Sequence, residues 1–438
     1  MVKGYPSNFS LRRYLIRGAS GSLVLIAGQT GMGLLLAVAL ARLLGVKGFG
    51  TYAFCLSIVN LLTVPAELGA HTLLVREVAA YNVKCEFHFL KGLLSRIRWT
   101  SFFFSLLITL IAAGVGLWVY HGREMAVPFL IAMMIIPWLT IMNLNGACLR
   151  GLRHVLLSRL PATLIPVVVL LIVGASYWIS ENKLTPEFVL SAQLLCTLGM
   201  FSVSCFLVYR YVSPSIQHVQ PAYETSKWCR SMLPFAVAGS IQILNREVSI
   251  VTLNCLQGPE SVGLYRVAQR GAGLVSFGLM AVNMAIAPTV SELFVKGEKK
   301  RLQHLISKSV LAVLAYSLPV TLFLVIGGAW FVPVIFGRDY GAAYLPLVVL
   351  SLGHLISAAM GSVGLILNMI GLERTTAWGV AIATIVNISL NICFVPSFGT
   401  IGAAIATSIS LVVWNVLLAI WLYKKTGIVS ILRLRLLH

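Results

Sequence analysis

Residues 18–43 read GASGSLVLIAGQTGMGLLLAVALARL, and residues 49–73 read FGTYAFCLSIVNLLTVPAELGAHTL. A membrane-spanning helix needs about 20 mostly apolar residues, so each stretch is long enough to cross a bilayer. The first stretch contains an AVA sequence that resembles a signal-peptide cleavage site, but it is far longer than the roughly 7–15-residue apolar core of a signal peptide. We therefore expect it to be retained as a helix, with the second stretch as the next membrane crossing.

The composition of the 438 residues agrees with a membrane protein. Hydrophobic residues make up 58% of the chain and charged residues 11%, whereas soluble domains carry about 25% charged residues. This composition excludes an ordinary soluble enzyme and a disordered chain. The eight cysteines form no CxxC pair and lie mostly in apolar stretches. We interpret them as small buried hydrophobic residues rather than as disulfide partners or metal ligands.

The whole chain divides into twelve apolar stretches separated by short polar gaps. They lie near residues 18–43, 49–73, 99–120, 126–148, 159–180, 187–209, 231–256, 261–287, 309–330, 344–370, 376–396 and 400–422. Each stretch is long enough for one crossing. The sequence therefore predicts an all-α, polytopic membrane protein with twelve transmembrane helices.

The positive charges indicate how the chain is oriented. The net charge is +20, but the basic residues lie in the gaps between apolar stretches, so we expect no nucleic-acid partner. With the N-terminus inside, 25 of the 33 Lys and Arg residues fall in inside segments and five fall outside. Cytoplasmic loops carry the excess of Lys and Arg in membrane proteins. We expect both termini to be cytoplasmic, and the basic inside segments 74–98, 210–230 and 288–308 to lie on anionic lipid.

Two short motifs indicate an internal repeat. Phe49-Gly50-Thr51-Tyr52 begins the second stretch and Val262-Gly263-Leu264-Tyr265 begins the eighth, 213 residues later. The same offset relates the starts of the other five pairs of stretches to within a few residues. Six helices per half make the repeats parallel, so a pseudo-two-fold axis runs along the membrane normal and the substrate site lies between two lobes. The predicted divisions are an N-terminal lobe at 1–210, a cytoplasmic linker at 211–230 and a C-terminal lobe at 231–438.

Several short motifs, in their order along the chain, resemble a known family of transporters. They are Ala41-Arg42-Leu43-Leu44-Gly45, Phe49-Gly50-Thr51-Tyr52, Glu67-Leu68-Gly69, Arg76-Glu77, Val262-Gly263-Leu264-Tyr265, Pro288 before Ser291-Glu292-Leu293, Phe336-Gly337-Arg338-Asp339-Tyr340, and Gly399-Thr400-Ile401-Gly402-Ala403-Ala404. The resemblance is to the Wzx-type O-antigen and polysaccharide flippases of the multidrug/oligosaccharidyl-lipid/polysaccharide exporter superfamily, and it spans nearly the whole chain.

This resemblance implies a twelve-helix, two-lobed carrier in the bacterial cytoplasmic membrane. Its substrate would be an undecaprenyl-diphosphate-linked oligosaccharide, such as an O-antigen unit for lipopolysaccharide biosynthesis. The carrier would move this substrate from the inner to the outer leaflet by alternating access, with glycan-assembly proteins as further partners. The resemblance does not identify the sugar.

Three arginines lie at membrane depth, where charge is costly. Arg266 and Arg270 are four residues apart and share one helix face, roughly 8 and 14 Å below the outer surface. A guanidinium binds phosphate oxygens through two hydrogen bonds, which suits a lipid diphosphate. We therefore predict that Arg266, Arg270 and Arg246 bind substrate. Arg42, at the outer end of the first stretch, is a further candidate, or an arginine that extends to the membrane surface.

Glu247 and two other titratable residues are candidates for a coupling-ion site. Glu247 is expected at the depth of Arg270, so it either neutralises that arginine or binds the ion. Glu67 either binds the ion or is a carboxylate at the end of its helix that pairs with Arg76 or another base. His354, near the middle of the tenth stretch, either relays a proton or hydrogen-bonds to a neighbouring helix.

Motifs for other chemistry are absent from the sequence. It contains no nucleotide-binding loop, no metal-ligand spacing and no nucleophile motif. We therefore expect a transporter rather than an enzyme, with no cofactor and no metal. Transport would then be driven by an H⁺ or Na⁺ gradient, by the membrane potential or by the substrate gradient.

Three other functions remain open. A drug or cation antiporter of the same superfamily would need acidic residues around its substrate, whereas three arginines accompany Glu247 alone. A lipid II flippase handles similar chemistry, but that family carries more helices than the twelve counted here. A membrane-embedded glycan polymerase or ligase would need catalytic loops outside the membrane, and the outside loops are too short for them.

Overall fold

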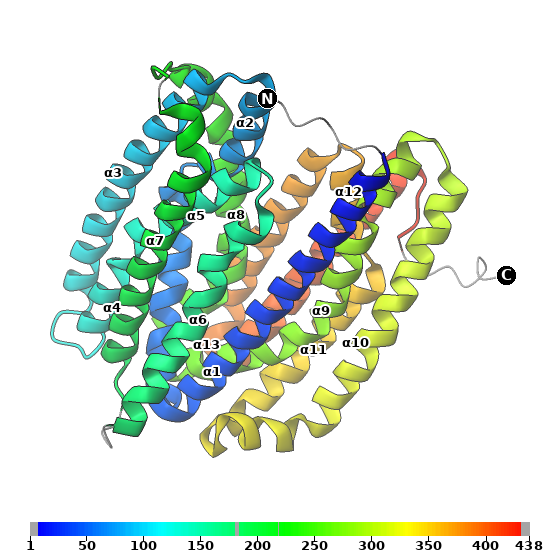
Figure 1. Cartoon of the computed structure of the whole chain (residues 1–438). Coiled ribbons are helices and arrows are strands. Elements are labelled where there is room, and N and C mark those ends of the chain that lie inside the picture. Colours follow the sequence, from blue (N-terminus) through cyan, green and yellow to red (C-terminus); the bar gives the residue numbers. More distant parts are fainter. Residues whose placement is uncertain (1–7, 180–183, 218, 431–438) are drawn as a thin grey trace. The chain divides into compact units, whose positions relative to one another are not determined.

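A computed structural model describes residues 8–179, 184–217 and 219–430 of the chain (Figure 1). Within these ranges every regular element is a helix and no strand occurs. The ends of the chain, predicted to be cytoplasmic, lie outside the described residues. The prediction of an all-α protein is confirmed.

The helices follow one another with short connections. In chain order they are α1 (Asn8–Ala66), α2 (Ala70–Lys84), α3 (Phe87–Val119), α4 (Ala126–Met133), α5 (Ile135–Gly151), α6 (Val155–Ile179), α7 (Pro186–Ile216), α8 (Thr225–Gln257), α9 (Pro259–Val295), α10 (Lys299–Phe336), the 3₁₀ helix η1 (Arg338–Ala343), α11 (Tyr344–Met360), α12 (Val363–Met369) and α13 (Glu373–Thr426).

The predicted twelve crossings correspond to these helices. Nine helical segments of the described chain are long and apolar enough to span a membrane. Two of them, in α1 and α13, bend at Gly45 and Gly399 and are long enough for two crossings each. α8 supplies one more crossing; its 33 residues are less apolar than those of the other spans. The protein is therefore a multi-pass membrane protein, with twelve crossings in the part of the chain that the structure describes.

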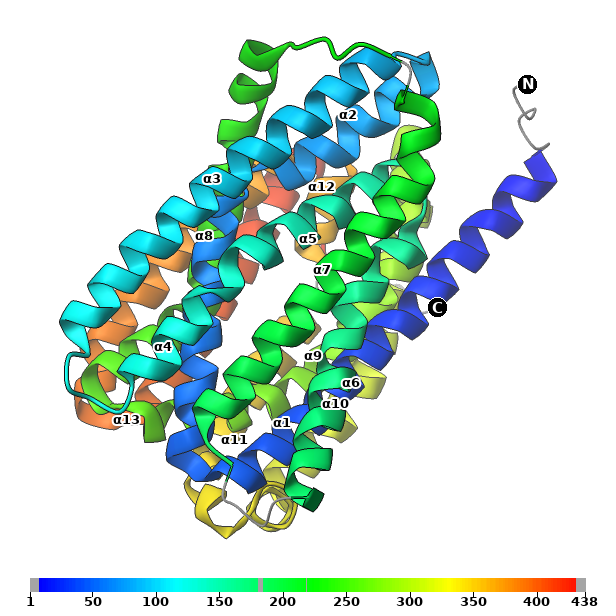
Figure 2. The same cartoon turned by 60° about the vertical axis from the view of Figure 1, so that its left-hand side comes forward.

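Residue contacts divide the chain into two compact units. Unit 1 comprises residues 1–36 and 59–240, and unit 2 comprises residues 37–58 and 241–438. In unit 1, α5 is the central helix, because it contacts α2, α3, α6 and α7 (Figure 2). Most of its side chains are buried, including Leu144, Asn145 and Ala147.

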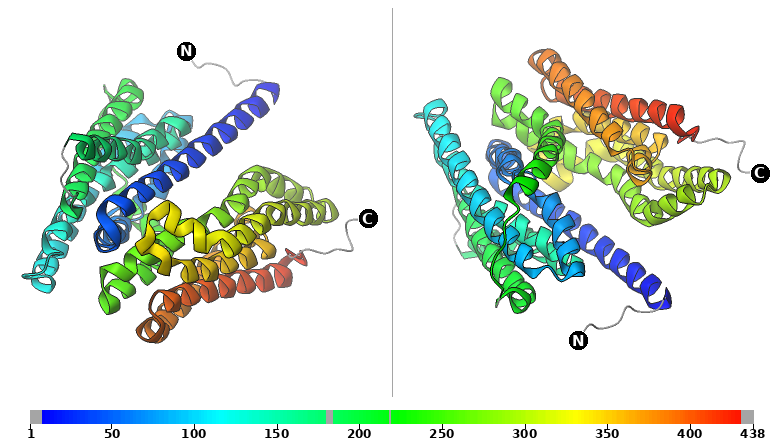
Figure 3. Two further views of the ribbon diagram at one scale, coloured as in Figure 1. Left: turned by 90° about the horizontal axis from the view of Figure 1, so that it is seen from below. Right: turned by 90° about the horizontal axis from the view of Figure 1, so that it is seen from above.

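In unit 2 the corresponding position belongs to α11, which contacts α9, α10 and α13 (Figure 3). α5 and α11 are the fourth and tenth predicted spans, so they are equivalent positions of the predicted repeat. Each is the most surrounded helix of its own unit. The lobe boundaries predicted from the repeat remain a prediction.

Two glycines with the same backbone conformation lie 213 residues apart. Gly45 has φ 69° and ψ 179°, and Gly258 has φ 87° and ψ −179°. This region of φ and ψ is essentially restricted to glycine. Each glycine lies between the end of one helix and the start of the next. The same backbone conformation therefore recurs with the 213-residue spacing of the sequence motifs.

The two motif glycines, Gly50 and Gly263, allow α1 and α9 to touch within unit 2. A Cβ atom at Gly50 would lie 1.7 Å from the backbone oxygen of Pro259, and one at Gly263 would lie 2.4 Å from that of Val46. Real Cβ atoms do not approach backbone atoms this closely. The two helices therefore pack backbone against backbone, which only glycine permits.

Residues 219–230, within the predicted linker, belong to unit 1 and pack against α2 and α3. The backbone N–H of Ala222 donates to the carbonyl of His88 at 3.0 Å. The buried Trp228 indole donates to the Tyr81 hydroxyl at 3.1 Å. Beside them, the hydrogen bond from Lys227 holds the pKa of Glu224 below its ordinary value. This segment is therefore held in place rather than merely joining two helices.

The glycine contact can be tested with alanine substitutions in α9. Gly263→Ala places a Cβ against the backbone of Val46, so the two helices must move apart. We expect this variant to lose at least about 2 kcal/mol of folding free energy. The measurement is unfolding of the purified protein in detergent. Gly273→Ala is the matched control on the same helix, because a Cβ there meets nothing within 4 Å. Equal stability of the two variants would contradict the close approach.

Candidate functional site: a cationic cluster in unit 2

Arg266 is the centre of a polar cluster between α1, α8 and α9. Its guanidinium donates to Ser57 Oγ at 2.8 Å and to Gln269 Oε1 at 2.8 Å. It also forms an ion pair with Glu247, with 3.4 Å between Arg266 NH2 and Glu247 Oε2. The side chains of Arg266 and Glu247 are 13% and 4% exposed. The cluster thus holds one acid and one base away from solvent.

The glycine contact explains why Arg266 meets Ser57. The second half of α1 and the start of α9 run in the same direction from Gly45 and Gly258. Ser57 lies two turns beyond Gly50, about 10 Å along the axis, and Arg266 lies one turn beyond Gly263. The arginine side chain spans the remaining distance. The close approach of two glycines therefore sets the position of a charge further into the membrane.

Glu247 pairs with a different arginine from the one expected. Glu247 is expected at the depth of Arg270, whereas the structure pairs Glu247 with Arg266. The expectation compared the levels of Cα atoms in the α8–α9 hairpin. A long, flexible arginine reaches about one helical turn along its own helix, so equal depth did not identify the partner.

Arg246 and Arg270 are the charges that remain without an acid. Neither forms an ion pair with an acidic residue in the part of the chain that the structure describes, and both are exposed. Arg246 points away from the buried Glu247, because successive helix residues lie about 100° apart. Counted from the bend at Gly258, both arginines lie about 18 Å along their helices. Two unpaired cations thus share one level of the membrane.

A chain of hydroxyl groups links three helices beside the cluster. The hydroxyls of Ser249 and Thr407 lie 2.9 Å apart, and those of Tyr265 and Thr407 lie 2.8 Å apart. Tyr265 is fully buried. These contacts join α8, α9 and α13, so the backbone that carries Arg246, Arg266 and Arg270 is held rigidly.

Arg42 lies in different surroundings. Its Nε donates to the carbonyl oxygen of Ile335 at 2.7 Å, and its NH2 contacts the carbonyl oxygen of Val334. Both carbonyls belong to the last turn of α10, where unpaired carbonyls attract cations. The structure does not bring Arg42 into hydrogen-bond contact with Arg246, Arg266 or Arg270.

Glu67 lies in unit 1, where the chain breaks between α1 and α2. Its carboxylate accepts a hydrogen bond from Asn143 Nδ2 at 2.8 Å, and it is 8% exposed. Arg76, the partner suggested by the sequence, instead pairs with its neighbour Glu77 at 2.9 Å. The break explains the difference, because Leu68 and Gly69 take positive φ values and redirect the chain before Arg76.

A second group of cations lies near Glu67, as the alternative of a base other than Arg76 allowed. Arg150 contacts the His71 ring, and it is the basic residue that acts on Glu67 electrostatically. The Nε atoms of Arg150 and Arg159 are buried and have no hydrogen-bond partner among the described residues. Asn143 and Arg150 are seven residues apart, two turns along one face of α5. This spacing in the sequence is the feature that could have indicated that Asn143 and Arg150 lie on the same side of α5.

His354 lies on α11, partly buried, and has no hydrogen-bond partner among the described residues. The interhelical hydrogen bond expected as an alternative to proton relay is therefore not seen in the described part of the chain. Three candidate coupling-ion residues thus have three settings. Glu247 is ion-paired, Glu67 accepts a hydrogen bond from an amide, and His354 has no hydrogen-bond partner among the described residues.

Comparison with known proteins gives the family and the fold. Residues 15–294 match the family model described as "Polysaccharide biosynthesis protein". The probable low-salt glycan biosynthesis flippase Agl15 of Haloferax volcanii is 24% identical over 261 residues, which are 58% of this chain and 53% of Agl15. The chain thus spans about half the length of this curated relative.

Solved structures of two transporters share the fold. An inward-facing multidrug-resistance MATE-family transporter of the MOP superfamily has a TM-score of 0.73 at 14% identity, covering 91% of this chain and 96% of its own. The lipid II flippase MurJ, in an inward closed conformation, has a TM-score of 0.68 at 14% identity, covering 91% of this chain and 86% of its own. At this identity the similarity concerns the fold alone.

The ion pair in unit 2 predicts a specific coupling between substitutions. Arg266→Ala leaves Glu247 buried without its cation, and we expect a loss of about 3 kcal/mol in unfolding free energy. Adding Glu247→Ala should recover much of that loss, because no lone charge remains buried. The measurement is a double-mutant cycle on purified protein in detergent.

Arg270 provides the control for this cycle. Arg270→Ala combined with Glu247→Ala should show little coupling, since Arg270 forms no ion pair with Glu247. Strict additivity for Arg266 and Glu247, with coupling appearing for Arg270 instead, would contradict the observed pairing.

Proposed function

Because the chain belongs to the polysaccharide biosynthesis protein family, we propose that it is a flippase that carries a lipid-linked oligosaccharide across the membrane. The proposed substrate is an undecaprenyl-diphosphate-linked oligosaccharide, such as an O-antigen unit or a related polysaccharide repeat. It would pass from the inner to the outer leaflet of a bacterial cytoplasmic membrane by alternating access. On this proposal the protein is a transporter and not an enzyme.

The observation that carries the proposal is the surplus of positive charge in the unit 2 cluster. Three arginines accompany one carboxylate, and Glu247 pairs only with Arg266. Moving an arginine to the bilayer centre costs about 2.5–3.5 kcal/mol on insertion scales. Arg246 and Arg270 are exposed at that level without an acid, so a water-filled cavity that receives an anion suits them best. A lipid diphosphate is such an anion.

Each residue of the cluster then has a role. Arg246 and Arg270 hold the diphosphate through two-point hydrogen bonds. Arg266, already engaged with Glu247, Ser57 and Gln269, supplies positive potential and keeps the site in shape. The polyprenyl tail stays in lipid, because only the headgroup needs a polar path across the membrane.

Coupling to an ion gradient is a further part of the proposal. Glu67 and Asn143 provide a carboxylate and an amide. The carboxylate can bind H⁺, and the carboxylate and amide oxygens can bind Na⁺. His354, without a polar partner among the described residues, is the second candidate for proton relay.

The charge balance separates this proposal from related functions. An exporter of organic cations needs net negative charge around its substrate, whereas the cluster is net positive. Lipid II also carries a diphosphate, so the cluster fits a lipid II flippase in the same way. Transport assays with defined sugars distinguish these two diphosphate substrates.

Transport in proteoliposomes tests the proposal. Purified protein should move a defined lipid-linked oligosaccharide between leaflets, and an imposed H⁺ or Na⁺ gradient should change the rate. Arg246→Gln or Arg270→Gln should lower apparent affinity about ten- to a hundredfold, the effect of losing a charged hydrogen bond. Both variants should fold normally, since neither arginine is ion-paired.

The exposed Arg374 supplies the matched control, because Arg374→Gln removes the same charge on the cytoplasmic side and should leave transport unchanged. Parental rates in both cluster variants would remove the support for a diphosphate site. Efflux of an organic cation, with no movement of lipid-linked sugar, would favour the antiporter.

A further inference from the structure

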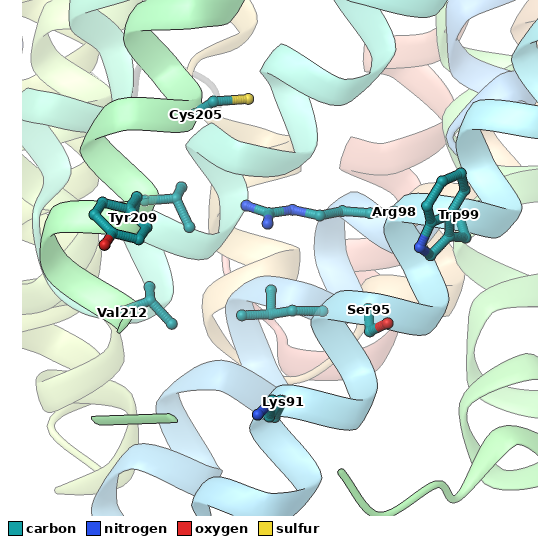
Figure 4. Close-up of a pocket in the computed structure, with 9 residues that line it drawn as sticks. Lys91, Ser95, Arg98, Trp99, Cys205, Tyr209 and Val212 are labelled. Atoms are coloured by element: carbon teal, nitrogen blue, oxygen red, sulfur yellow. The ribbon is translucent and has the colours of Figure 1, made fainter. Parts of the chain in front are cut away.

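A pocket of about 330 Å³ lies between α3 and α7 of unit 1. Figure 4 shows Arg98 reaching from α3 toward α7, with Lys91 and Ser95 on the same stretch of α3. These three residues occupy positions i, i+4 and i+7, so they share one helix face over two turns. The remaining lining residues are Leu94, Trp99, Cys205, Val208, Tyr209 and Val212.

Arg98 is held in position by a buried amide. Its NH2 donates to Asn145 Oδ1 at 2.7 Å, and Asn145 donates in turn to Ser204 Oγ at 3.0 Å. Asn145 is 1% exposed. A guanidinium has five N–H donors, and Arg98 has no acidic partner among the described residues. The fixed guanidinium therefore offers both charge and donors to the pocket.

Lys91 adds a second charge without an acid. Its ammonium donates to the carbonyl oxygens of Val219 at 2.9 Å and Gln217 at 3.4 Å. No ion pair joins it to an acidic residue in the ranges that the structure covers. These carbonyls orient the ammonium but do not neutralise it, so the pocket is net positive.

Aromatic and apolar side chains place the pocket at the membrane surface. Trp99 and Tyr209 line it and are 60% and 64% exposed, as residues of the interfacial aromatic belt are. Beyond them along α3 the exposed side chains are apolar, including Phe103 and Leu110. Phe206 on α7 is exposed as well. A pocket that contains two cationic side chains thus opens beside a surface suited to acyl chains.

The charge distribution places this surface on the cytoplasmic side. The beginning of α3 and the end of α7 belong to the inside segments that carry most of the Lys and Arg residues. The cytoplasmic leaflet carries anionic lipids, and basic pockets between transmembrane helices on that side bind their headgroups.

We infer that the α3–α7 pocket binds the phosphate headgroup of an anionic phospholipid of the cytoplasmic leaflet. Arg98 and Lys91 hold the phosphate, Ser95 adds a hydroxyl, and the acyl chains lie along the apolar faces of α3 and α7. This site is separate from the Arg266 cluster and does not depend on the transported substrate.

The test measures the binding of phosphatidylglycerol to the full-length protein by native mass spectrometry. Phosphatidylcholine with the same acyl chains and inorganic phosphate are the two comparison ligands. We expect preferential binding of phosphatidylglycerol, reduced about fivefold by Lys91→Gln or by Arg98→Gln, as for one basic residue beside an anionic headgroup.

Arg96→Gln is the matched control, because Arg96 is exposed on the same helix and does not line the pocket. An equal loss in that variant would show diffuse surface attraction and overturn the proposal. Inorganic phosphate that displaces phosphatidylglycerol completely would also overturn it, because the site would then be one for free anions.

A second measurement leaves Arg98 and Lys91 unchanged, so it does not depend on whether the charge variants fold. Brominated phosphatidylglycerol should quench the fluorescence contributed by Trp99, taken as the difference between the parental protein and Trp99→Phe, more strongly than brominated phosphatidylcholine. Equal quenching by the two lipids would contradict a headgroup site, whatever the stability of the charge variants.

Discussion

The backbone contact between Gly50 and Gly263 is the constraint on which the functional part of unit 2 depends. Two helices that touch without side chains between them hold their later turns at fixed separation. That separation brings Ser57 within 2.8 Å of Arg266 and leaves the arginine close enough to Glu247 for an ion pair. A side chain at either glycine would displace this contact and every charge that follows it along α9.

Charge inside the membrane is the second constraint, and it sorts the arginines into two classes. Arg266 is compensated by Glu247 and by neutral acceptors, so it is stable when buried. Arg246 and Arg270 form no ion pair with an acidic residue in the described part of the chain, so they need water or an anion. The same principle applies in unit 1, where Arg98 and Lys91 at the membrane surface are oriented by neutral oxygens alone. A membrane protein that retains uncompensated cations at defined depths presents them to anionic ligands.

The sequence alone predicted the helical class, the twelve crossings and the equivalence of Gly50 with Gly263, because these depend on local hydrophobicity and on a repeated motif. It did not predict the partner of Glu247, since an arginine side chain reaches beyond the level of its own Cα atom. The partners of Glu67 could not be predicted because the helix breaks at Leu68 and Gly69, which changes the direction of the chain. The α3–α7 pocket is lined by residues more than a hundred positions apart in the sequence. The periodicity of apolar residues does not predict contacts between such distant residues. The sequence alone therefore predicts where helices form, whereas side-chain partners can be identified only from the three-dimensional structure.

The central claim is that the uncompensated arginines of α8 and α9 select a lipid diphosphate. The most direct measurement is the affinity of the purified protein for undecaprenyl diphosphate and for uncharged undecaprenol, before and after Arg246→Gln and Arg270→Gln are combined. The parental protein should prefer the diphosphate by at least about tenfold, and the double variant should lose most of that preference. Equal affinity for the two lipids in the parental protein, or a preference that survives loss of both arginines, would contradict the account.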